Sequence, residues 1–294
     1  MLSNYYQNLS TLKPLIYEQG VIQANQQFTP FAFTDLFTSK MNESGQPIIH
    51  YWQLEHSVIL GMKDSRVPHF DEALQSLVQK NYQVMLRNSG GLGIIADSGI
   101  LNISFILPNP DHQSLSINSA YELVMRLIQE AFQSFNQKIE AKEIYDSYCP
   151  GDYDLSIDGK KFAGIAQRRI KEGISVMIYL SVNGPQIKRG QVMRQFYQLG
   201  LAEHFGENGY PPVSTNSMAN LEDLLNTSLS VNEVKELITA SFQNLFTKKL
   251  VPITEQEIIG NSEVAAAFAR QIERMSDRNE LITNLLGGTN ENTL

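Results

Sequence analysis

The order of hydrophobic and polar positions divides the chain into a strand-rich first part and a helical last part. Short apolar runs bounded by turn-forming residues are typical of strands. We expect such strands at 48–54, 57–60, 82–86, 94–95, 99–107 and 139–144. Apolar residues three and four positions apart predict helices at 71–80 and 121–135. Residues 1–50 are expected to be irregular and helical.

A β-hairpin is predicted around the dipeptide Asp158-Gly159. This dipeptide favours a type I′ turn because both central residues of such a turn need positive φ. The flanking strands are 153–157 and 162–167, and 174–182 is expected to extend the same sheet. A two-residue turn at this point places Ser156 opposite Lys161.

Helical spacing dominates after about residue 190. The expected helices are 192–201, 221–225, 231–245 and 254–278, followed by a frayed end from residue 286. Strands and helices in mixed order are typical of an α+β fold. We therefore expect a mixed β-sheet core with helices packed around it over residues 1–190. A helical C-terminal extension over 191–294 is expected to pack on that core.

The composition is that of a globular protein, with 42% hydrophobic and 18% charged residues in a chain of 294. No apolar run approaches the roughly 20 residues that a membrane span needs, so we expect no membrane association. The N-terminus lacks the basic and apolar stretches of a secretory signal. A single cysteine cannot form a disulfide within the chain, which favours the reducing environment of the cytoplasm.

The net charge of -8 and the pI near 5.2 argue against nucleic-acid binding, which usually leaves a basic footprint. One local cluster of cations departs from this acidic balance. It consists of Lys160, Lys161, Arg168, Arg169 and Lys171. A basic patch of this kind suits an acidic protein partner. A solvated strand end without a partner explains it equally well, so both interpretations stay open.

The single cysteine, Cys149, is expected on a loop because Pro150-Gly151 follows it directly. Pro and Gly at these positions favour a type II turn over 149–152, which would bend the chain and bring the thiol toward Lys161. An ammonium group close to a thiol stabilises the thiolate and can donate to an oxygen that becomes negative during acyl transfer. The residues alone leave a nucleophilic Cys149 and an inert thiol both open.

A glycine loop is the second candidate element, and it reads Arg87-Asn88-Ser89-Gly90-Gly91. Its glycines let backbone N–H groups come close to a bound carbonyl group or acyl chain. Metal-binding spacing, in contrast, is absent from the sequence, so we expect no metal. The histidines are scattered singly, at His50, His56, His69, His112 and His204.

Two motifs together resemble the biotin/lipoate protein ligase superfamily. One is the glycine loop, and the other is Gly159-Lys160-Lys161-Phe162-Ala163-Gly164. In that superfamily a glycine loop and a Gly-x-Lys-x-x-Gly strand flank an acyl-binding tunnel. The resemblance extends over about residues 52–182 and implies a catalytic domain of the lipoate and biotin ligase type.

Residues 147–169 are most similar to the cysteine-dependent octanoyltransferases of this superfamily in Gram-positive bacteria. The nucleophile of those enzymes lies in a Ser-Tyr-Cys-Pro-Gly motif, which residues 147–151 reproduce. The resemblance therefore implies that residues 1–190 are an acyltransferase core with Cys149 and Lys161 as catalytic residues. The substrate-binding residues that it implies are Arg87, Ser89, Gly90, Gly91 and Gly164.

The implied reaction belongs to lipoate biosynthesis and proceeds through an acyl-enzyme. The thiolate of Cys149 attacks the octanoyl-lysine amide of the glycine cleavage H protein, while Lys161 and backbone donors near Gly90 and Gly91 stabilise the oxyanion. The target lysine of an apo lipoyl domain, in an E2 subunit of a 2-oxoacid dehydrogenase, then attacks the thioester. Donor and product bonds are both amides, so the reaction needs no ATP and no cofactor.

The chain also departs from related patterns. The ATP-dependent lipoate ligases have a His-Asp pair where this chain has Ala96-Asp97, and the octanoyltransferases that use acyl carrier protein have an arginine where Leu92 lies. These differences favour transfer from the H protein. The alternatives are transfer from acyl carrier protein, ATP-dependent ligation, and a non-catalytic protein that binds acylated lipoyl domains. The sequence does not distinguish octanoyl from lipoyl as the cargo.

Overall fold

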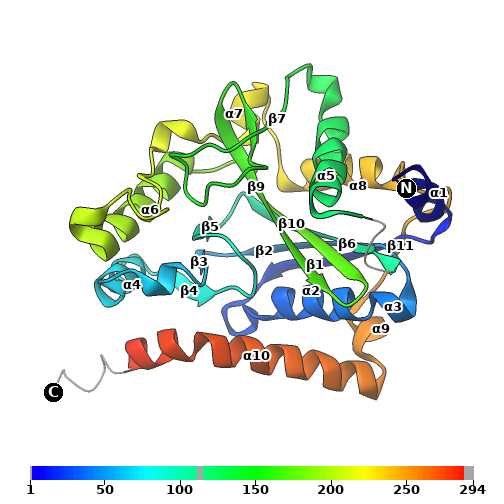
Figure 1. Ribbon diagram of the computed structural model, residues 1–294, viewed down its shortest axis with the longest axis horizontal. Coiled ribbons are helices and arrows are strands. Elements are labelled where there is room, and N and C mark those ends of the chain that lie inside the picture. The colour runs from blue at the N-terminus through cyan, green and yellow to red at the C-terminus, as the bar shows by residue number, and fades with distance from the viewer. Residues whose placement is uncertain (1, 111–114, 288–294) are drawn as a thin grey trace.

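A mixed β-sheet forms the centre of the molecule and carries helices on both faces (Figure 1). In this computed structural model, which describes residues 2–110 and 115–287, the described strands follow the order β11-β1-β2-β6-β10-β9-β8-β7. They are β1 (Leu15–Ile22), β2 (Ile48–Leu54), β6 (Ile100–Pro108), β7 (Glu140–Ala141), β8 (Leu155–Ile157), β9 (Lys160–Ile170), β10 (Gly173–Ser181) and β11 (Val251–Pro252). The α+β fold expected from the sequence is confirmed.

A smaller sheet has the order β4-β3-β5 and positions the glycine loop. Its strands are β3 (Ser57–Leu60), β4 (Gln83–Leu86) and β5 (Ile94–Ala96). Ile59, Met85 and Ile95 are almost completely buried in one hydrophobic core beneath it. Because β4 and β5 both pair with β3, the loop that joins them, residues 87–93, is held at both ends by buried strands.

Helices pack around both sheets, and some of them form a layer on each side of the large sheet. They are α1 (Leu2–Thr11), α2 (Thr29–Ser39), α3 (Met41–Ser44), α4 (Phe70–Val78), α5 (Ile117–Ala131), α6 (Gln186–Leu201), α7 (Leu221–Leu225), α8 (Val231–Gln243), α9 (Glu255–Ile259) and α10 (Ser262–Gly287). Figure 1 shows α5 and α8 on one side of the large sheet, and α2, α3 and α10 on the other. Among the described residues, none of these helices is both long and apolar enough to span a bilayer.

The elements after residue 190 pack on both sides of the large sheet. Phe242 of α8 packs against Phe105 of β6, with ring centroids 5.7 Å apart. Phe268 of α10 packs against Phe33 of α2 at 4.3 Å. Strand β11 pairs with β1 at the edge of the sheet. The boundary between core and extension at residue 190 stays a prediction.

The hairpin around Asp158-Gly159 has the predicted geometry. Both residues have positive φ, 50° and 75° respectively. Ser156 lies opposite Lys161, as the two-residue turn predicts. The local sequence therefore determines which residue of β9 faces the end of β8.

Two predictions about secondary structure are wrong. Residues 15–22 form β1, although they were expected to be irregular or helical. Their apolar run is interrupted by Glu18-Gln19-Gly20, and the register shifts at this point, so the alternation that marks a strand is lost. The helix expected at 254–278 is divided into α9 and α10 at Gly260.

The second of these helices begins with a local cap, because Asn261 Oδ1 accepts the backbone N–H of Glu263 at 2.8 Å. It continues to Gly287. The frayed end expected from residue 286 therefore falls mostly on 288–294, outside the described residues.

A buried histidine gives the fold a defined pH dependence. His50 is 0% exposed, and burial lowers its pKa to about 3 from an ordinary value of 6.5. Its ring nitrogens lie 3.3 Å from Thr34 Oγ1 and 3.0 Å from Gln19 Oε1. The unfolded chain binds a proton near pH 6.5 and the folded chain does not, so stability decreases as the pH falls below 6.5 towards 3.

We expect the variant His50→Gln to lose less stability on acidification than the wild type. The wild type should lose about 2 kcal/mol through His50 between pH 7 and pH 5, because each pH unit below 6.5 costs about 1.4 kcal/mol. Urea unfolding of both proteins at the two pH values measures the difference. Equal losses in both would show that His50 does not control this dependence.

Candidate active site

The residues singled out in the sequence gather around one cavity of about 280 Å³. They are Cys149, Lys161, Arg87, Ser89, Gly90, Gly91 and Gly164. Much of the remaining wall is apolar and includes Phe31, Ile59, Ile94, Met177 and Ile178. A cavity with a thiol and a few polar groups on otherwise apolar walls suits an acyl chain attached to a polar reacting group.

The thiol of Cys149 is partly buried and faces two donors of the glycine loop. The backbone N–H of Leu92 lies 3.3 Å from Cys149 Sγ, and Arg87 Nη2 lies 3.4 Å from it. Arg87 is only 8% exposed, and Nη2 also donates to the carbonyl oxygen of Leu92 at 2.8 Å. A cation and a backbone N–H therefore both point at the sulfur as hydrogen-bond donors.

Gly91 makes this approach possible. Its φ is +98°, and a Cβ atom at this position would lie 2.2 Å from Arg87 Nη2 and 3.2 Å from Cys149 Sγ. A side chain at residue 91 would therefore occupy the space between guanidinium and thiol. Gly61 has a related role, because a Cβ there would lie 1.9 Å from the carbonyl oxygen of Gly91.

Lys161 lies beneath the cysteine and holds its backbone. Its Nζ donates to the carbonyl oxygens of Tyr148 at 3.0 Å and Cys149 at 2.6 Å. It also forms an ion pair with Asp154 Oδ1 at 2.9 Å, and both side chains are 3% exposed or less. Nζ thus has three oxygen partners, all within 13 residues of it in the sequence.

A β-bulge allows both Lys161 and Gly164 to line the active-site cavity. In a regular strand, residues three apart point to opposite faces. Here Lys161 pairs with Ser156 and Ala163 pairs with Leu155, which leaves Phe162 as an extra residue of β9. The extra residue reverses the alternation, so both Lys161 and Gly164 line the cavity.

Asp154 was not singled out in the sequence. Burial raises the pKa of this carboxyl group, and the ammonium group of Lys161 opposes that shift. The other oxygen, Oδ2, accepts the backbone N–H groups of Gly151 at 3.2 Å and Ile144 at 3.3 Å. The signal available in the sequence was an aspartate inside the predicted strand 153–157, because aspartate is uncommon in strands.

The predicted type II turn over 149–152 is wrong. In that turn Gly151 would have positive φ, but Cys149 has it instead, at 50°. The observed turn is formed two residues later, over 151–154, where the N–H of Asp154 donates to the carbonyl oxygen of Gly151 at 3.0 Å. A non-glycine residue in the left-handed region is uncommon, and here Lys161 and Asp154 hold the surrounding backbone in place.

Tyr148 anchors the other side of the cysteine loop. Its side chain is 1% exposed, and its hydroxyl is hydrogen-bonded to Tyr179 and accepts from Gln186 Nε2 at 3.2 Å. Burial raises the pKa of Tyr148 to about 12, so the phenol is neutral. Tyr153 stacks on Tyr121 with centroids 4.5 Å apart, and thus packs against α5.

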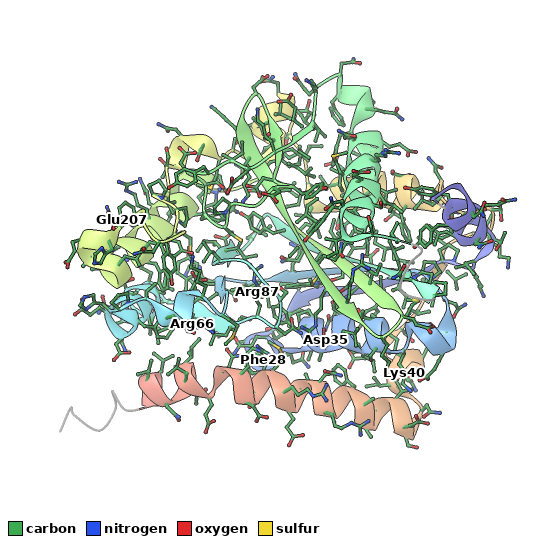
Figure 2. All side chains as sticks on the ribbon, in the orientation of Figure 1. Phe28, Asp35, Lys40, Arg66, Arg87 and Glu207 are labelled. Carbon is green, nitrogen blue, oxygen red and sulfur yellow. The ribbon has the colours of Figure 1, made fainter. Side chains whose placement is uncertain are left out.

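The basic cluster of β9 does not form one patch. Lys161 is buried beneath Cys149, and Arg168 forms a two-point ion pair with Asp35 at 2.8 and 3.2 Å. Asn88 of the glycine loop joins this pair, because its Nδ2 donates to Asp35 at 2.9 Å. Figure 2 labels Asp35 and Arg87, which come from α2 and the glycine loop.

Metal ligands do not gather anywhere in residues 2–110 and 115–287. Within these ranges no group of three or more His, Cys, Asp or Glu side chains could hold an ion. His112, one of the five histidines considered, lies outside the described residues.

We expect Arg87→Gln to slow alkylation of Cys149 by iodoacetamide at pH 7 by about 10- to 100-fold. The reason is the loss of a charged donor, since hydrogen bonds to charged groups contribute about 1.5–3 kcal/mol. Arg87→Lys should recover part of the rate. Stopped-flow alkylation with mass detection measures both. Equal rates in wild type and Arg87→Gln would show that Arg87 does not act on the thiol.

The sequence and the fold correspond to a known class of protein. The family model of the lipoyl protein ligase A/B catalytic domain matches residues 26–243. The chain therefore belongs to the lipoyl protein ligase A/B catalytic-domain family. A bi-partite lipoate protein ligase from Thermoplasma acidophilum has the same fold, with a TM-score of 0.63 and 18% identity over 88% of this chain and 92% of that one.

Closer relatives are transferases. The octanoyl-[GcvH]:protein N-octanoyltransferase of Macrococcus caseolyticus is 42% identical over 254 residues, which are 86% of this chain and 90% of the relative. The lipoyl-[GcvH]:protein N-lipoyltransferase of Listeria monocytogenes is 44% identical over 181 residues, 62% of this chain and 65% of the relative. Both names describe the transfer of an acyl group from a GcvH protein.

Proposed function

We propose that this protein is an acyltransferase that moves an octanoyl group from the H protein of the glycine cleavage system to apo lipoyl domains of 2-oxoacid dehydrogenase E2 subunits. The observation that carries the proposal is the thiol of Cys149, held 3.3–3.4 Å from two donors at the wall of a mostly apolar cavity. The relatives with about 40% identity support the same activity.

The first step forms an acyl-enzyme. The sulfur of Cys149 attacks the amide carbonyl carbon of octanoyl-lysine, and the carbonyl oxygen becomes an oxyanion. The N–H of Leu92 and the guanidinium group of Arg87 are the donors closest to that oxygen, because they already face the sulfur. The C–N bond then breaks, the thiol proton ends on the departing lysine amine, and a thioester remains.

The second step reverses the first with a different amine. The neutral ε-amine of the target lysine attacks the thioester carbon, and Cys149 leaves as a thiolate that takes up the amine proton. One amide is consumed and one amide is formed, so no ATP is required. The reaction needs a reduced thiol, which supports a place in the cytoplasm.

The structure around Asp97 favours transfer over ligation. The histidine of the ligase pair is replaced by Ala96, and Asp97 Oδ1 forms an ion pair with Arg189 Nε at 2.7 Å. Arg189 is completely buried and neither residue lines the active-site cavity, so this ion pair is a structural feature. The carboxylate of Asp97 is therefore already paired with a side chain of the protein itself.

A second cargo, the lipoyl group, is favoured by one feature of the cavity. Trp52 and Asn102 are paired across β2 and β6 and both line the cavity wall. Their nitrogens Nε1 and Nδ2 are buried, and within the described residues they have no hydrogen-bond partner. Sulfur atoms of a dithiolane ring are weak acceptors for such donors, whereas an alkyl chain offers none.

The test mixes the enzyme with an octanoylated H protein and an apo lipoyl domain in the absence of ATP. Parallel reactions use octanoyl-acyl carrier protein, octanoate with ATP, or lipoylated H protein. We expect mass spectrometry to detect acylation of the lipoyl domain from the H protein donors without ATP. A product formed only from octanoate with ATP would overturn the proposal in favour of ligation. A product formed only from octanoyl-acyl carrier protein would show that this carrier, and not the H protein, is the donor.

A further inference from the structure

A second cavity of about 330 Å³ lies beside the active site. It is bordered by the end of α2, the turn between β9 and β10, and α10, and Asp35 and Lys40 are labelled in this region in Figure 2. Cations dominate its charged lining, where Asp35 and Glu263 are the carboxylates. The cations are Lys40, Arg168, Lys171, Arg270 and Arg274.

Several of these cations are not neutralised. Arg168 is paired with Asp35, and Lys40 with Glu43 and Glu263. For Lys171, Arg270 and Arg274, no carboxylate of the described part of the chain lies within ion-pair distance, and all three are exposed. The protein as a whole carries a net charge of -8, so a group of unpaired cations is a local exception.

The arginines of α10 form one stripe that leads toward the active site. Arg270, Arg274 and Arg278 are four residues apart, and such residues share a helix face. The next residue, Asn279, is hydrogen-bonded to the backbone of Leu86. Its Nδ2 donates to the carbonyl oxygen of Leu86 at 3.1 Å, and its Oδ1 accepts the N–H of Leu86 at 2.7 Å. Leu86 directly precedes Arg87, so the end of the stripe is hydrogen-bonded to the strand that carries the glycine loop.

The two cavities also share a wall. Asn88 lines the active-site cavity and donates to Asp35, which lines the second cavity. Arg168 Nη1 in turn donates to the carbonyl oxygen of Asn88 at 2.7 Å. A partner bound along α10 therefore lies next to the wall of the active-site cavity that contains Asn88.

We propose that this cleft, lined by Lys171, Arg270 and Arg274, is the docking surface for acidic side chains of the protein that carries the acyl group. The inference rests on the proposed function, since only a protein substrate needs a docking surface beside the cavity. An acidic protein is repelled by the rest of a surface with net charge -8 and attracted here. Such complementarity orients the encounter and accelerates association.

The test is the double variant Arg270→Glu/Arg274→Glu. Its matched control is Lys248→Glu/Lys249→Glu, which changes the net charge equally at two exposed lysines in the loop between α8 and β11. At low salt we expect the KM for octanoylated H protein to rise about tenfold or more in the cleft variant, and to stay within about twofold in the control. The advantage of the wild type should shrink as salt is added.

A small donor separates this inference from the proposed function. The octanoyl thioester of N-acetylcysteamine bypasses docking, so it should acylate Cys149 at similar rates in the cleft variant, the control and the wild type. Equal KM values for H protein in both variants would overturn the docking surface. A wild type that takes an octanoyl group from neither donor would overturn the proposed function instead.

Discussion

Replacement of Cys149 by serine lowers the rate of octanoyl transfer between carrier proteins by at least about 10³-fold. Serine has nearly the same shape, and its hydroxyl still accepts from the N–H of Leu92 and from Arg87, whose contacts with the sulfur are 3.3 and 3.4 Å. The nucleophile is lost because a serine hydroxyl is not ionised at neutral pH, and among the described residues no histidine or carboxylate is hydrogen-bonded to the group at position 149. Rates from the lipoyl-domain assay, measured with wild type and variant at equal concentration, give the ratio.

The fold should be unaffected by this change. Thermal unfolding followed by circular dichroism serves as the control, with a Tm within a few degrees of the wild type, because the side chain is only partly buried. A serine variant that transfers within tenfold of the wild-type rate would show that Cys149 is an inert thiol.

Lys161→Ala is expected to destabilise the protein by about 3–5 kcal/mol as well as to abolish transfer. Removing one member of a buried ion pair leaves the other charge uncompensated, and Asp154 lies at 2.9 Å from Nζ with its side chain 2% exposed. The carbonyl oxygens of Tyr148 and Cys149 lose a donor in the same step. Urea unfolding at pH 7 measures the loss of stability.

A double variant separates the structural and functional parts of this effect. Lys161→Met/Asp154→Asn removes both charges and keeps an amide oxygen for the N–H groups of Gly151 and Ile144. It should recover most of the stability, since neither new side chain leaves an uncompensated charge in the buried site. It should not recover transfer, because the loop that positions Cys149 remains without its ammonium donor. Full activity in the double variant would assign Lys161 a purely structural role.

Local sequence explains the parts of the site that were predicted well. The Asp158-Gly159 turn fixes the register of β8 and β9, and this register places Lys161 at a position from which it reaches the cysteine loop. The spacing of apolar residues likewise predicts a helix at 121–135, and the structure has one there, α5, which begins four residues earlier and ends at Ala131. In both cases the decisive interactions lie within a few residues of one another.

Contacts between distant segments explain what was missed. Arg87 and Cys149 are 62 residues apart, and nothing local to either predicts that the guanidinium group faces the sulfur. Asn279 contacts Leu86 across 193 residues, so the link between α10 and the glycine loop had no sequence signal. The positive φ of Cys149 depends on the hydrogen bonds that Lys161 and Asp154 make around it, and turn preferences alone favoured Gly151 instead.

The central claim is that the acyl group passes through Cys149, and intact-protein mass spectrometry tests it most directly. Enzyme is mixed with octanoylated H protein without ATP and without a lipoyl domain, quenched in acid and weighed. We expect the wild type to gain the mass of one octanoyl group, which hydroxylamine removes, and Cys149→Ser to gain none. An unmodified wild type under conditions in which the lipoyl domain is acylated, or an equal adduct on Cys149→Ser, would contradict it.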